Sequence, residues 1–253
     1  MNYIISLQKK KVREEEKLYI VEGDKLVKEF LAAGVRVRTL VGKPEFLNSL
    51  PVVHKHGVGE IIPASYEVLK KMSSLTTPHN ALAVIEMPEK EVDLRSIAHG
   101  LTVALDCVQD PGNLGTIIRA AAWFGINNIY CSEDCVDAYN SKVIQSSMGA
   151  IMHVNVFYIP LKDLLEKATA QKIKVYGTML EGHSIYSYKL ANNGIILLGN
   201  ESKGISEEYL TFVTDKIMIP KLNETRPGID SLNVSMAASV IFSEFTRSKG
   251  RQM

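Results

Sequence analysis

The sequence predicts an α/β protein in two parts, a small mixed α/β unit followed by a larger domain built on a parallel sheet. The chain has 253 residues, of which 46% are hydrophobic and 23% charged, a balance typical of globular proteins. From Leu101 onward, apolar runs alternate with segments long enough for helices. This alternation is typical of parallel strands joined by crossover helices.

The boundary between the two parts is expected at Met87–Ser96, where a proline and dense charge separate apolar runs. We therefore predict an N-terminal domain at 1–90, a linker at 91–99 and a second domain at 100–253. In the first domain, the runs LYIVEG, VRVRTLVG and ALAVIEM are expected to be strands. The segment GDKLVKEFLAAG has helical spacing and is closed by Gly34.

The second domain contains five apolar runs that predict strands in succession. They are LTVALD (101–106), NIYCS (128–132), VNVFYI (154–159), KIKVYGTM (172–179) and GIILLGN (194–200). KIMIP follows, then a long loop and a helix expected from about Asn233 to Arg247.

Composition excludes several classes of protein. No apolar run approaches the length of a bilayer span, and the start of the chain becomes charged too early for a signal peptide, so we expect a cytoplasmic protein without a membrane segment. The three cysteines, Cys107, Cys131 and Cys135, have no paired spacing and are expected to be reduced, with neither a disulfide nor a metal site. A net charge of +1 argues against a protein that coats nucleic acid, although residues 9–13, or Arg36 with Arg38, could form a local basic face.

Ligands of open parallel sheets bind at the carboxyl ends of the strands, so the loops there are the candidates for a site. Gly199 and Gly204 have P-loop spacing, but the lysine that must follow is missing. Gly112 and Gly115 lack the third glycine of a dinucleotide-binding fingerprint. Three loops hold the polar residues of interest: QDPGNLGTIIR (109–119), LGNESKGIS (198–206) and IPKLNETRPGIDSLNVS (219–235).

Taken together, these loops resemble the three motifs of the SpoU branch of the SPOUT superfamily, which are knotted RNA ribose 2′-O-methyltransferases. The first motif matches Asn113, Gly115 and Arg119; the second matches residues 199–204; the third matches 231–235. Taken singly, Asn113 could be a helix cap, Arg119 a surface residue and Glu201 a turn residue. The segment YIVEGDKLVKEFL (19–31) is also similar to the ribosomal-protein-like RNA-binding domain of many members.

The resemblance implies a deep trefoil knot, a homodimer and S-adenosylmethionine as cofactor. Arg119 would stabilise the developing charge on the ribose oxygen and grip the adjacent phosphate, since its high reference pKa makes it a poor base. Asn113 and Asn233 would hold the ribose or anchor loops, and Glu201 would position Arg119 or a loop amide. The residues that would line or lie near the adenosine pocket are Gly199, Ile219, Leu232, Thr178 and Leu198.

Two departures from the family pattern stand out. Lys221 occupies the position where the family commonly has methionine, and the loop from Pro220 to Ser231 is longer than usual, with the inserted segment NETRPG. Ribosomal RNA of the 23S type is the preferred substrate, bound partly through Lys9 to Arg13. Transfer RNA is the alternative substrate, and an RNA-binding or assembly protein without catalysis is the alternative class.

Overall fold

The chain is described by a computed structural model that covers residues 1–92, 97–222 and 230–250. It divides into two compact units. The first comprises residues 1–90 together with 137–152, and the second comprises 91–136 together with 153–253. The segment 137–152, which the sequence places inside the second domain, thus packs with the first unit.

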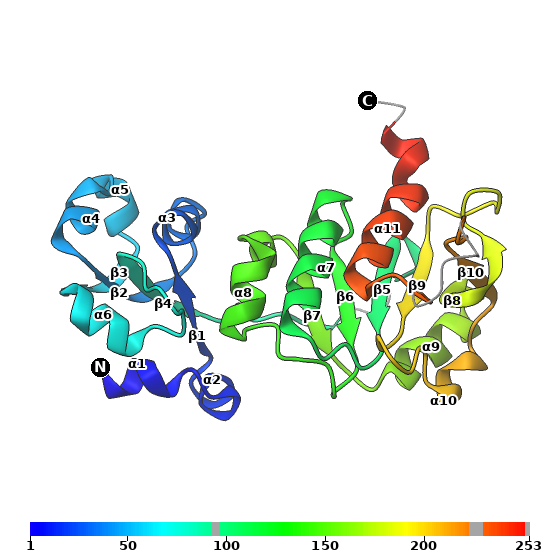
Figure 1. Cartoon of the computed structure of the whole chain (residues 1–253), viewed down its shortest axis with the longest axis horizontal. Coiled ribbons are helices and arrows are strands. Elements are labelled where there is room, and N and C mark those ends of the chain that lie inside the picture. Colours follow the sequence, from blue (N-terminus) through cyan, green and yellow to red (C-terminus); the bar gives the residue numbers. More distant parts are fainter. Residues whose placement is uncertain (93–96, 223–229, 251–253) are drawn as a thin grey trace. The chain divides into compact units, whose positions relative to one another are not determined.

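The first unit contains a four-stranded mixed sheet in the order β1-β4-β2-β3 (Figure 1). The predicted strands are confirmed as β1 (Leu18–Glu22), β2 (Val37–Gly42) and β4 (Ala81–Glu86). β4 is antiparallel to β1 and β2, whereas β2 and β3 (Val58–Pro63) are parallel. β1 and β4 are almost entirely buried, β4 because it is a central strand and β1, at the edge, because helices pack against it.

The predicted helix of the first unit is confirmed as α3 (Asp24–Ala32), which is followed by Gly34 with a φ of +71°. Its buried side chains Leu26, Val27, Phe30 and Leu31 recur at helical spacing. Further elements lack so clear a pattern in the sequence. They are α1 (Asn2–Ser6), α2 (Lys10–Glu16), α4 (Pro44–Ser49), α5 (Val52–Lys55) and α6 (Tyr66–Met72).

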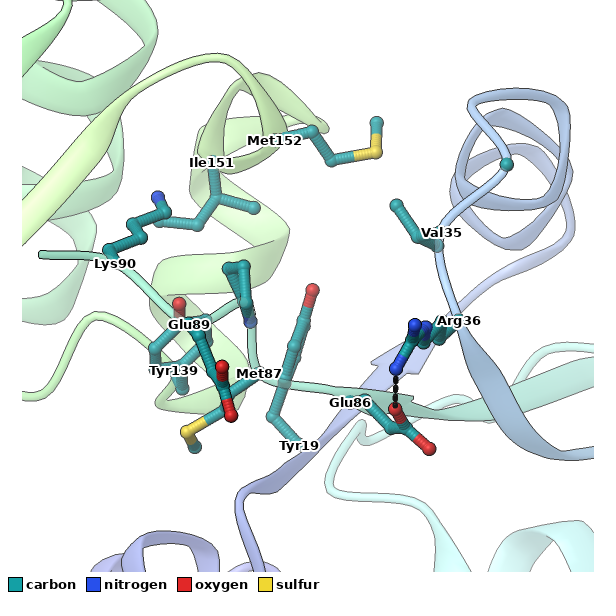
Figure 2. Close-up of a pocket in the computed structure, with 12 residues that line it drawn as sticks. Tyr19, Val35, Arg36, Glu86, Met87, Glu89, Lys90, Tyr139, Ile151 and Met152 are labelled. Carbon is teal, nitrogen blue, oxygen red and sulfur yellow. Dashed lines mark ion pairs between the residues drawn. The ribbon is translucent and has the colours of Figure 1, made fainter.

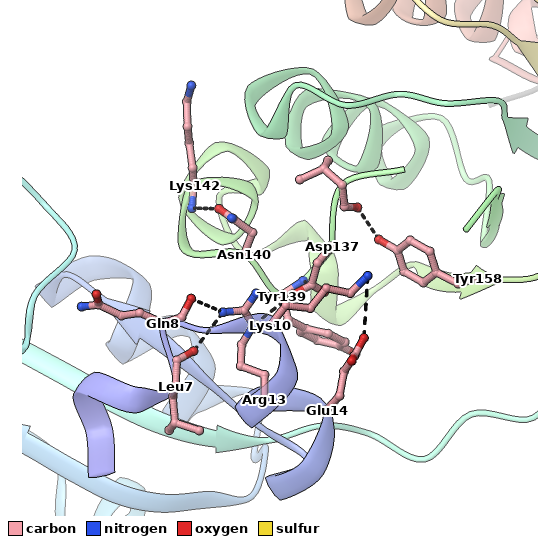
Figure 3. Close-up of polar contacts among 11 residues, drawn as sticks. Leu7, Gln8, Lys10, Arg13, Glu14, Asp137, Tyr139, Asn140, Lys142 and Tyr158 are labelled. Carbon is pink, nitrogen blue, oxygen red and sulfur yellow. Dashed lines mark hydrogen bonds and ion pairs between the residues drawn. The ribbon is translucent and has the colours of Figure 1, made fainter. Parts of the chain in front are cut away.

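Arg13 of α2 is buried, with only 4% of its surface exposed (Figure 3). Its guanidinium forms an ion pair with Asp137 and donates hydrogen bonds to the carbonyl oxygens of Leu7 (2.9 Å) and Gln8 (2.7 Å). A buried guanidinium is stable only when such partners satisfy its N–H groups. The expectation that Arg13 contacts RNA phosphate is therefore wrong. The neighbouring Lys10 and Lys11 are exposed and lie within 4.0 Å of Glu14 and Glu15.

The segment 137–152 contains α8 (Ser141–Ser147) and the short 3₁₀ helix Ala150–Met152. Asp137 of this segment forms the ion pair with Arg13. In addition, Gln145 donates a hydrogen bond from Nε2 to the carbonyl oxygen of Glu22 (2.8 Å). The rings of Tyr19 and Tyr139 lie 4.6 Å apart. These contacts join the segment to β1 as part of one unit.

The second unit contains a six-stranded sheet in the order β10-β8-β9-β5-β6-β7, with every pair parallel (Figure 1). The prediction of a parallel sheet is confirmed. The strands, all near their predicted positions, are β5 (Leu101–Leu105), β6 (Asn128–Cys131), β7 (Asn155–Tyr158), β8 (Val175–Ser184), β9 (Gly194–Leu198) and β10 (Asp215–Met218).

Helices cover both faces of this sheet. On one face, α9 (Leu161–Ala170) packs its leucines against Ala104 and Leu197 in a shared core. On the other, α7 (Pro111–Trp123) and α11 (Val234–Gly250) pack together, and Phe245 makes an edge-to-face contact with Tyr176. Because both faces are covered, β5 and β9 are buried at every position, which explains their continuous apolar runs. α10 (Glu207–Leu210) precedes β10.

Within the described ranges, no helix combines the length and the apolar character needed to cross a bilayer. The same residues contain no group of three or more His, Cys, Asp or Glu side chains placed to bind a metal ion. All three cysteines are free thiols.

Candidate active site

The first motif forms the start of α7. Asp110 is the N-cap residue, and its Oδ1 accepts a hydrogen bond from the backbone N–H of Asn113 (2.9 Å). Pro111 follows at the first helical position, where its missing N–H costs nothing. The turn-forming residues are therefore the cap and first turn of a helix. Because Asp110 is the cap, the side chain of Asn113 is available for other contacts.

The three motifs meet at the side chain of Asn113. Its Nδ2 donates to Oε1 of Glu201 (2.7 Å), and its Oδ1 accepts from Nδ2 of Asn233 (2.9 Å). The partners are 88 and 120 residues away in the sequence. Each amide uses one of its two N–H groups, and among the described residues neither the second N–H nor Oε2 of Glu201 has a partner. Two donors and one carboxylate oxygen are thus available to a ligand.

Asn233 also begins the last helix. Its Oδ1 accepts hydrogen bonds from the backbone N–H groups of Ser235 (3.0 Å) and Met236 (3.3 Å), and from the hydroxyl of Ser235 (2.7 Å). One oxygen therefore caps α11 while the nitrogen of the same amide binds Asn113. This double use fixes the orientation of the amide.

Arg119 is not part of this network. It lies on α7 six residues beyond Asn113, about 9 Å along the helix axis at 1.5 Å per residue. Its side chain is exposed, and it forms no hydrogen bond or ion pair with any residue in the described ranges. Glu201, expected to position either Arg119 or a loop amide, binds the side-chain amide of Asn113.

The second motif is a tight loop after β9. Asn200 and Gly204 form an isolated antiparallel bridge, with both N–H···O distances at 2.9 Å. Gly204 has a φ of +72°, which favours glycine. At Gly199, a Cβ atom would lie 2.2 Å from the carbonyl carbon of Gly204. Glycine is therefore required at Gly199 by the close approach of the backbone.

Asn200 anchors this loop and was not assigned a role from the sequence. Its Nδ2 donates to the carbonyl oxygen of Cys107 (2.7 Å), which follows β5. Its Oδ1 accepts from the backbone N–H groups of Ser202 (2.9 Å) and Lys203 (3.1 Å). Asn200 thereby holds the backbone on either side of Glu201. Its place between Gly199 and Glu201 was the only sequence signal for this role.

Asp106 closes the other end of the loop. Its carboxylate is 3% exposed, and Oδ2 accepts a hydrogen bond from the backbone N–H of Ser206 (2.6 Å). Its own N–H donates to the carbonyl oxygen of Leu198 (2.9 Å). The ends of β5 and β9 are thus joined on both sides of the loop. A polar residue directly after an apolar strand is a signal that could have identified Asp106.

Cys107 connects this anchor to the neighbouring strand end. It has a φ of +56°, and its N–H donates to the hydroxyl of Ser132 (2.9 Å). A hydrogen bond to Asp134, together with burial, raises the pKa of the Cys107 thiol to about 11. The thiol is therefore protonated at neutral pH and can donate to Asp134, while its sulfur lies 3.8 Å from the Asn200 Nδ2 donor.

Four of the residues expected near the cofactor lie in or directly after three adjacent strands, β10, β8 and β9, and Leu232 shortly precedes α11. The strand pairings end at Leu198 and Met218, so Gly199 and Ile219 lie just beyond the sheet. Thr178 donates a hydrogen bond from its hydroxyl to the carbonyl oxygen of Leu197 (3.0 Å). Leu232 is 48% exposed, which leaves an apolar side chain open to an uncharged ring. The inserted segment 223–228 lies outside the described residues.

Comparisons with known proteins identify the family of each part of the chain. Residues 100–243 match the family model of the SpoU rRNA Methylase family, and residues 1–83 match that of the MRM3-like substrate binding domain. A protein from Porphyromonas gingivalis assigned to the TrmH family of RNA methyltransferases is 36% identical in sequence. Its structure aligns with a TM-score of 0.83 over 98% of this chain and 96% of that one.

Two further relatives extend the comparison. The 23S rRNA (guanosine(2553)-2'-O)-methyltransferase RlmP of Bacillus subtilis is 28% identical over 237 residues, which cover 93% of this chain and 91% of that protein. An AdoMet-bound rRNA methyltransferase from Sinorhizobium meliloti is 25% identical, with a TM-score of 0.83 over 98% and 94% of the two chains.

A parallel α/β sheet whose strand-end loops converge on an amide and carboxylate cluster, with these matches, defines an RNA methyltransferase. The chain belongs to the SpoU rRNA methylase family, as its three motifs indicated.

Proposed function

We propose that this protein transfers a methyl group from S-adenosylmethionine to a ribose 2′-hydroxyl of 23S-type ribosomal RNA. The observation that carries the proposal is the hydrogen-bonded cluster of Asn113, Glu201 and Asn233. Its two unused N–H donors and one carboxylate oxygen suit a ribose, whose hydroxyls both donate and accept. Relatives named as 23S rRNA and mitochondrial rRNA methyltransferases support ribosomal RNA as the substrate class.

The cofactor pocket is proposed at the ends of β8, β9 and β10. When bound, S-adenosylmethionine supplies a methyl group already activated by a sulfonium. Gly199, Ile219 and Leu232 offer main-chain groups and apolar surface without cations, which fits a ligand that has no phosphate. Thr178 and Leu198 would support this pocket without lining it directly. The Thr178 hydroxyl donates to β9, and the Leu198 side chain is buried in the core.

Arg119 is proposed to act on the RNA side of the reaction. Its exposed, permanently charged guanidinium can bind the phosphate beside the reacting ribose and stabilise negative charge on the 2′-oxygen. In the transfer the S–CH₃ bond would break as the O–CH₃ bond forms at this oxygen, and the hydroxyl proton would pass to substrate phosphate or water. Asn113 and Asn233 would orient the ribose, and Glu201 would hold the amide of Asn113 in place.

The test is methyl transfer from labelled S-adenosylmethionine to a large-subunit ribosomal RNA transcript and, separately, to bulk transfer RNA. Arg119→Ala should lower the rate about 10²- to 10³-fold, as expected when a group that stabilises transition-state charge is removed. Its cofactor affinity, measured by calorimetry, should stay within about twofold of wild type because the arginine acts on the acceptor. Arg247→Ala, which removes an exposed arginine of α11, is the matched control.

Other outcomes would redirect the proposal. Preferred methylation of transfer RNA would change the substrate class. RNA binding without heat from S-adenosylmethionine would indicate a binding or assembly protein. Mapping 2′-O-methyl positions in total RNA with and without the gene would identify the nucleotide. Fractionation of cells would test the proposed cytoplasmic location.

A homodimer and a trefoil knot are also part of the proposal. Trp123 on α7 and Met236 on α11 are 84% and 61% exposed, and these helices pack together, which supports burial of this apolar surface by a second copy. Light scattering should give a dimer, which Trp123→Glu should dissociate.

The route of the chain from the central strand β9 to the edge strand β10, and back to α11 beside α7, supports the knot. Mechanical stretching should then give a contour shorter than the full chain length.

A further inference from the structure

A cavity of about 550 Å³ lies in the first unit (Figure 2). It is lined by Tyr19 of β1, by residues 34–36 after α3, by residues 86–90 at and after the end of β4, and by Tyr139, Ile151 and Met152. All of these belong to the first unit and none to the loops of the candidate active site. The volume falls within the range of pockets that bind small organic ligands.

Two tyrosines give the cavity hydroxyl groups that can bind a ligand. Tyr19 is only 3% exposed, yet neither its hydroxyl nor that of Tyr139 has a hydrogen-bond partner among the described residues. In Figure 2 the Tyr19 ring projects from β1 into the space between Val35 and Ile151. Burial raises the pKa of both phenols, that of Tyr139 to about 12, so both are O–H donors at neutral pH. These hydroxyls are therefore open to a ligand group that accepts a hydrogen bond.

Charged groups of both signs surround the cavity. Arg36 lies 3.9 Å from Glu86, with side chains 89% and 45% exposed, and so weak a surface pair can exchange one partner for a ligand. Burial lowers the pKa of Lys90, and Glu89 lies beside it in the lining. Free phosphate would meet the two carboxylates as well as the cations. A ligand with an anionic group and separate N–H donors fits this arrangement better.

The remaining lining is apolar and adaptable. Met87, Met152 and Ile151 contribute flexible or bulky side chains. Methionine sulfur makes favourable contacts with aromatic rings of varied shape. Together with the Tyr19 and Tyr139 rings, these side chains suit a flat heterocycle.

We propose that this cavity binds one unpaired nucleotide of the RNA substrate, with the base against Tyr139 and the methionines and the phosphate at Arg36 and Lys90. An unpaired nucleotide presents both its ring faces and its hydrogen-bonding edges, whereas a paired one does not. The inference rests on the proposed function for its RNA. It extends RNA recognition beyond residues 1–83, the range that matches a substrate-binding domain, to 86–90 and 137–152.

The double variant Tyr19→Phe, Tyr139→Phe tests the cavity while retaining both rings. Because each change removes an unpaired hydroxyl, the fold should be retained, and thermal unfolding checks this. Tyr66→Phe is the matched control, since Tyr66 lies in the same unit outside the cavity. The probes are a large-subunit ribosomal RNA transcript and bulk transfer RNA, and dissociation constants are measured by filter binding.

The double variant should bind the preferred RNA about 5- to 30-fold more weakly, the effect of losing two neutral hydrogen bonds. Tyr66→Phe should leave the dissociation constant unchanged. Ultraviolet cross-linking of wild-type protein should yield nucleotide adducts on peptides spanning 86–90 or 139–152. Val35→Trp, which fills the cavity, should weaken binding as well.

Unchanged RNA affinity in both the double variant and Val35→Trp would overturn the proposal, as would adducts confined to other segments. Methyl transfer measured in parallel separates this result from failure of the proposed function. Normal transfer with unchanged RNA affinity in the variants would reject only the nucleotide cavity. If the wild-type protein transfers no methyl group but the variants still lose RNA affinity, the nucleotide cavity is supported and the proposed reaction is rejected.

Discussion

The side-chain amide of Asn233 both caps the last helix through its oxygen and donates from its nitrogen to Asn113 at 2.9 Å. One residue therefore couples the start of α11 to the start of α7, 120 residues earlier in the chain. Helix formation and site geometry depend on the same side chain, and substitutions can separate the two roles.

Asn233→Asp should retain the helix cap and lose the donor to Asn113, whereas Asn233→Ala should lose both. We expect Asn233→Ala to lower the free energy of unfolding by about 1 kcal/mol, the usual effect of losing a cap. Asn233→Asp should be close to wild type in urea unfolding, and both variants should be impaired in methyl transfer. If Asn233→Asp were fully active, the donor to Asn113 would have no role in the site.

Gly199→Ala should disrupt the second-motif loop. The added Cβ would meet the Gly204 carbonyl carbon at 2.2 Å, so the backbone must move, at a cost of about 1–3 kcal/mol. Calorimetry should show weaker binding of S-adenosylmethionine, because the displaced residues are those assigned to its pocket. Gly100→Ala is the control, since a Cβ there meets nothing within 4 Å. Equal cofactor affinity in the two variants would contradict the assignment.

Arg13→Met should leave Asp137 without its buried cation and lower the free energy of unfolding by about 3–5 kcal/mol. In the double variant Arg13→Met, Asp137→Leu, most of this loss should be recovered, because no unpaired charge is left in the interior. Urea unfolding of the two variants and the wild type measures the difference. Lys11→Met is the control, because Lys11 lies on the same helix with its side chain 85% exposed. If all three variants lost similar amounts of unfolding free energy, the buried ion pair would contribute no more to stability than an exposed lysine.

The free energy of unfolding should fall at alkaline pH, because the Cys107 thiol loses its proton there. The folded protein raises its thiol pKa from 9.0 to about 11, so the folded state holds the proton more tightly than the unfolded state. This contribution is complete below pH 9 and is lost as the pH rises towards about 11. Cys107→Ser should flatten the decline of unfolding free energy across this window. An unchanged pH profile in the variant would assign the decline to other groups.

The second sheet could be predicted because its central strands are buried on both faces. β5 and β9 are buried at every position and mostly apolar, and the signal does not depend on partners elsewhere in the chain. β3 gave no such signal, since it is an edge strand whose residues are mostly exposed. Helices of four to seven residues, such as α5 and α2, are too short for a clear apolar period.

The residues of the site could be predicted from the sequence, but the contacts between them could not. Asn113, Glu201 and Asn233 could be identified from motif spacing, but their mutual hydrogen bonds required the fold. The role of Asn200 depends on the carbonyl of Cys107, 93 residues away, and no local pattern encodes it. Arg13 was misjudged for the same reason, because its burial follows from Asp137, 124 residues further along the chain.

The ion pair between Arg13 and Asp137 has a consequence for how the chain matures during synthesis. Domains generally fold as they leave the ribosome, beginning with the N-terminal one. Here the first unit includes residues 137–152, so its native packing cannot be completed until that segment has been translated and released. In a nascent chain ending at residue 90, Arg13 would lack its acidic partner, and the surface of β1 that α8 contacts would be uncovered.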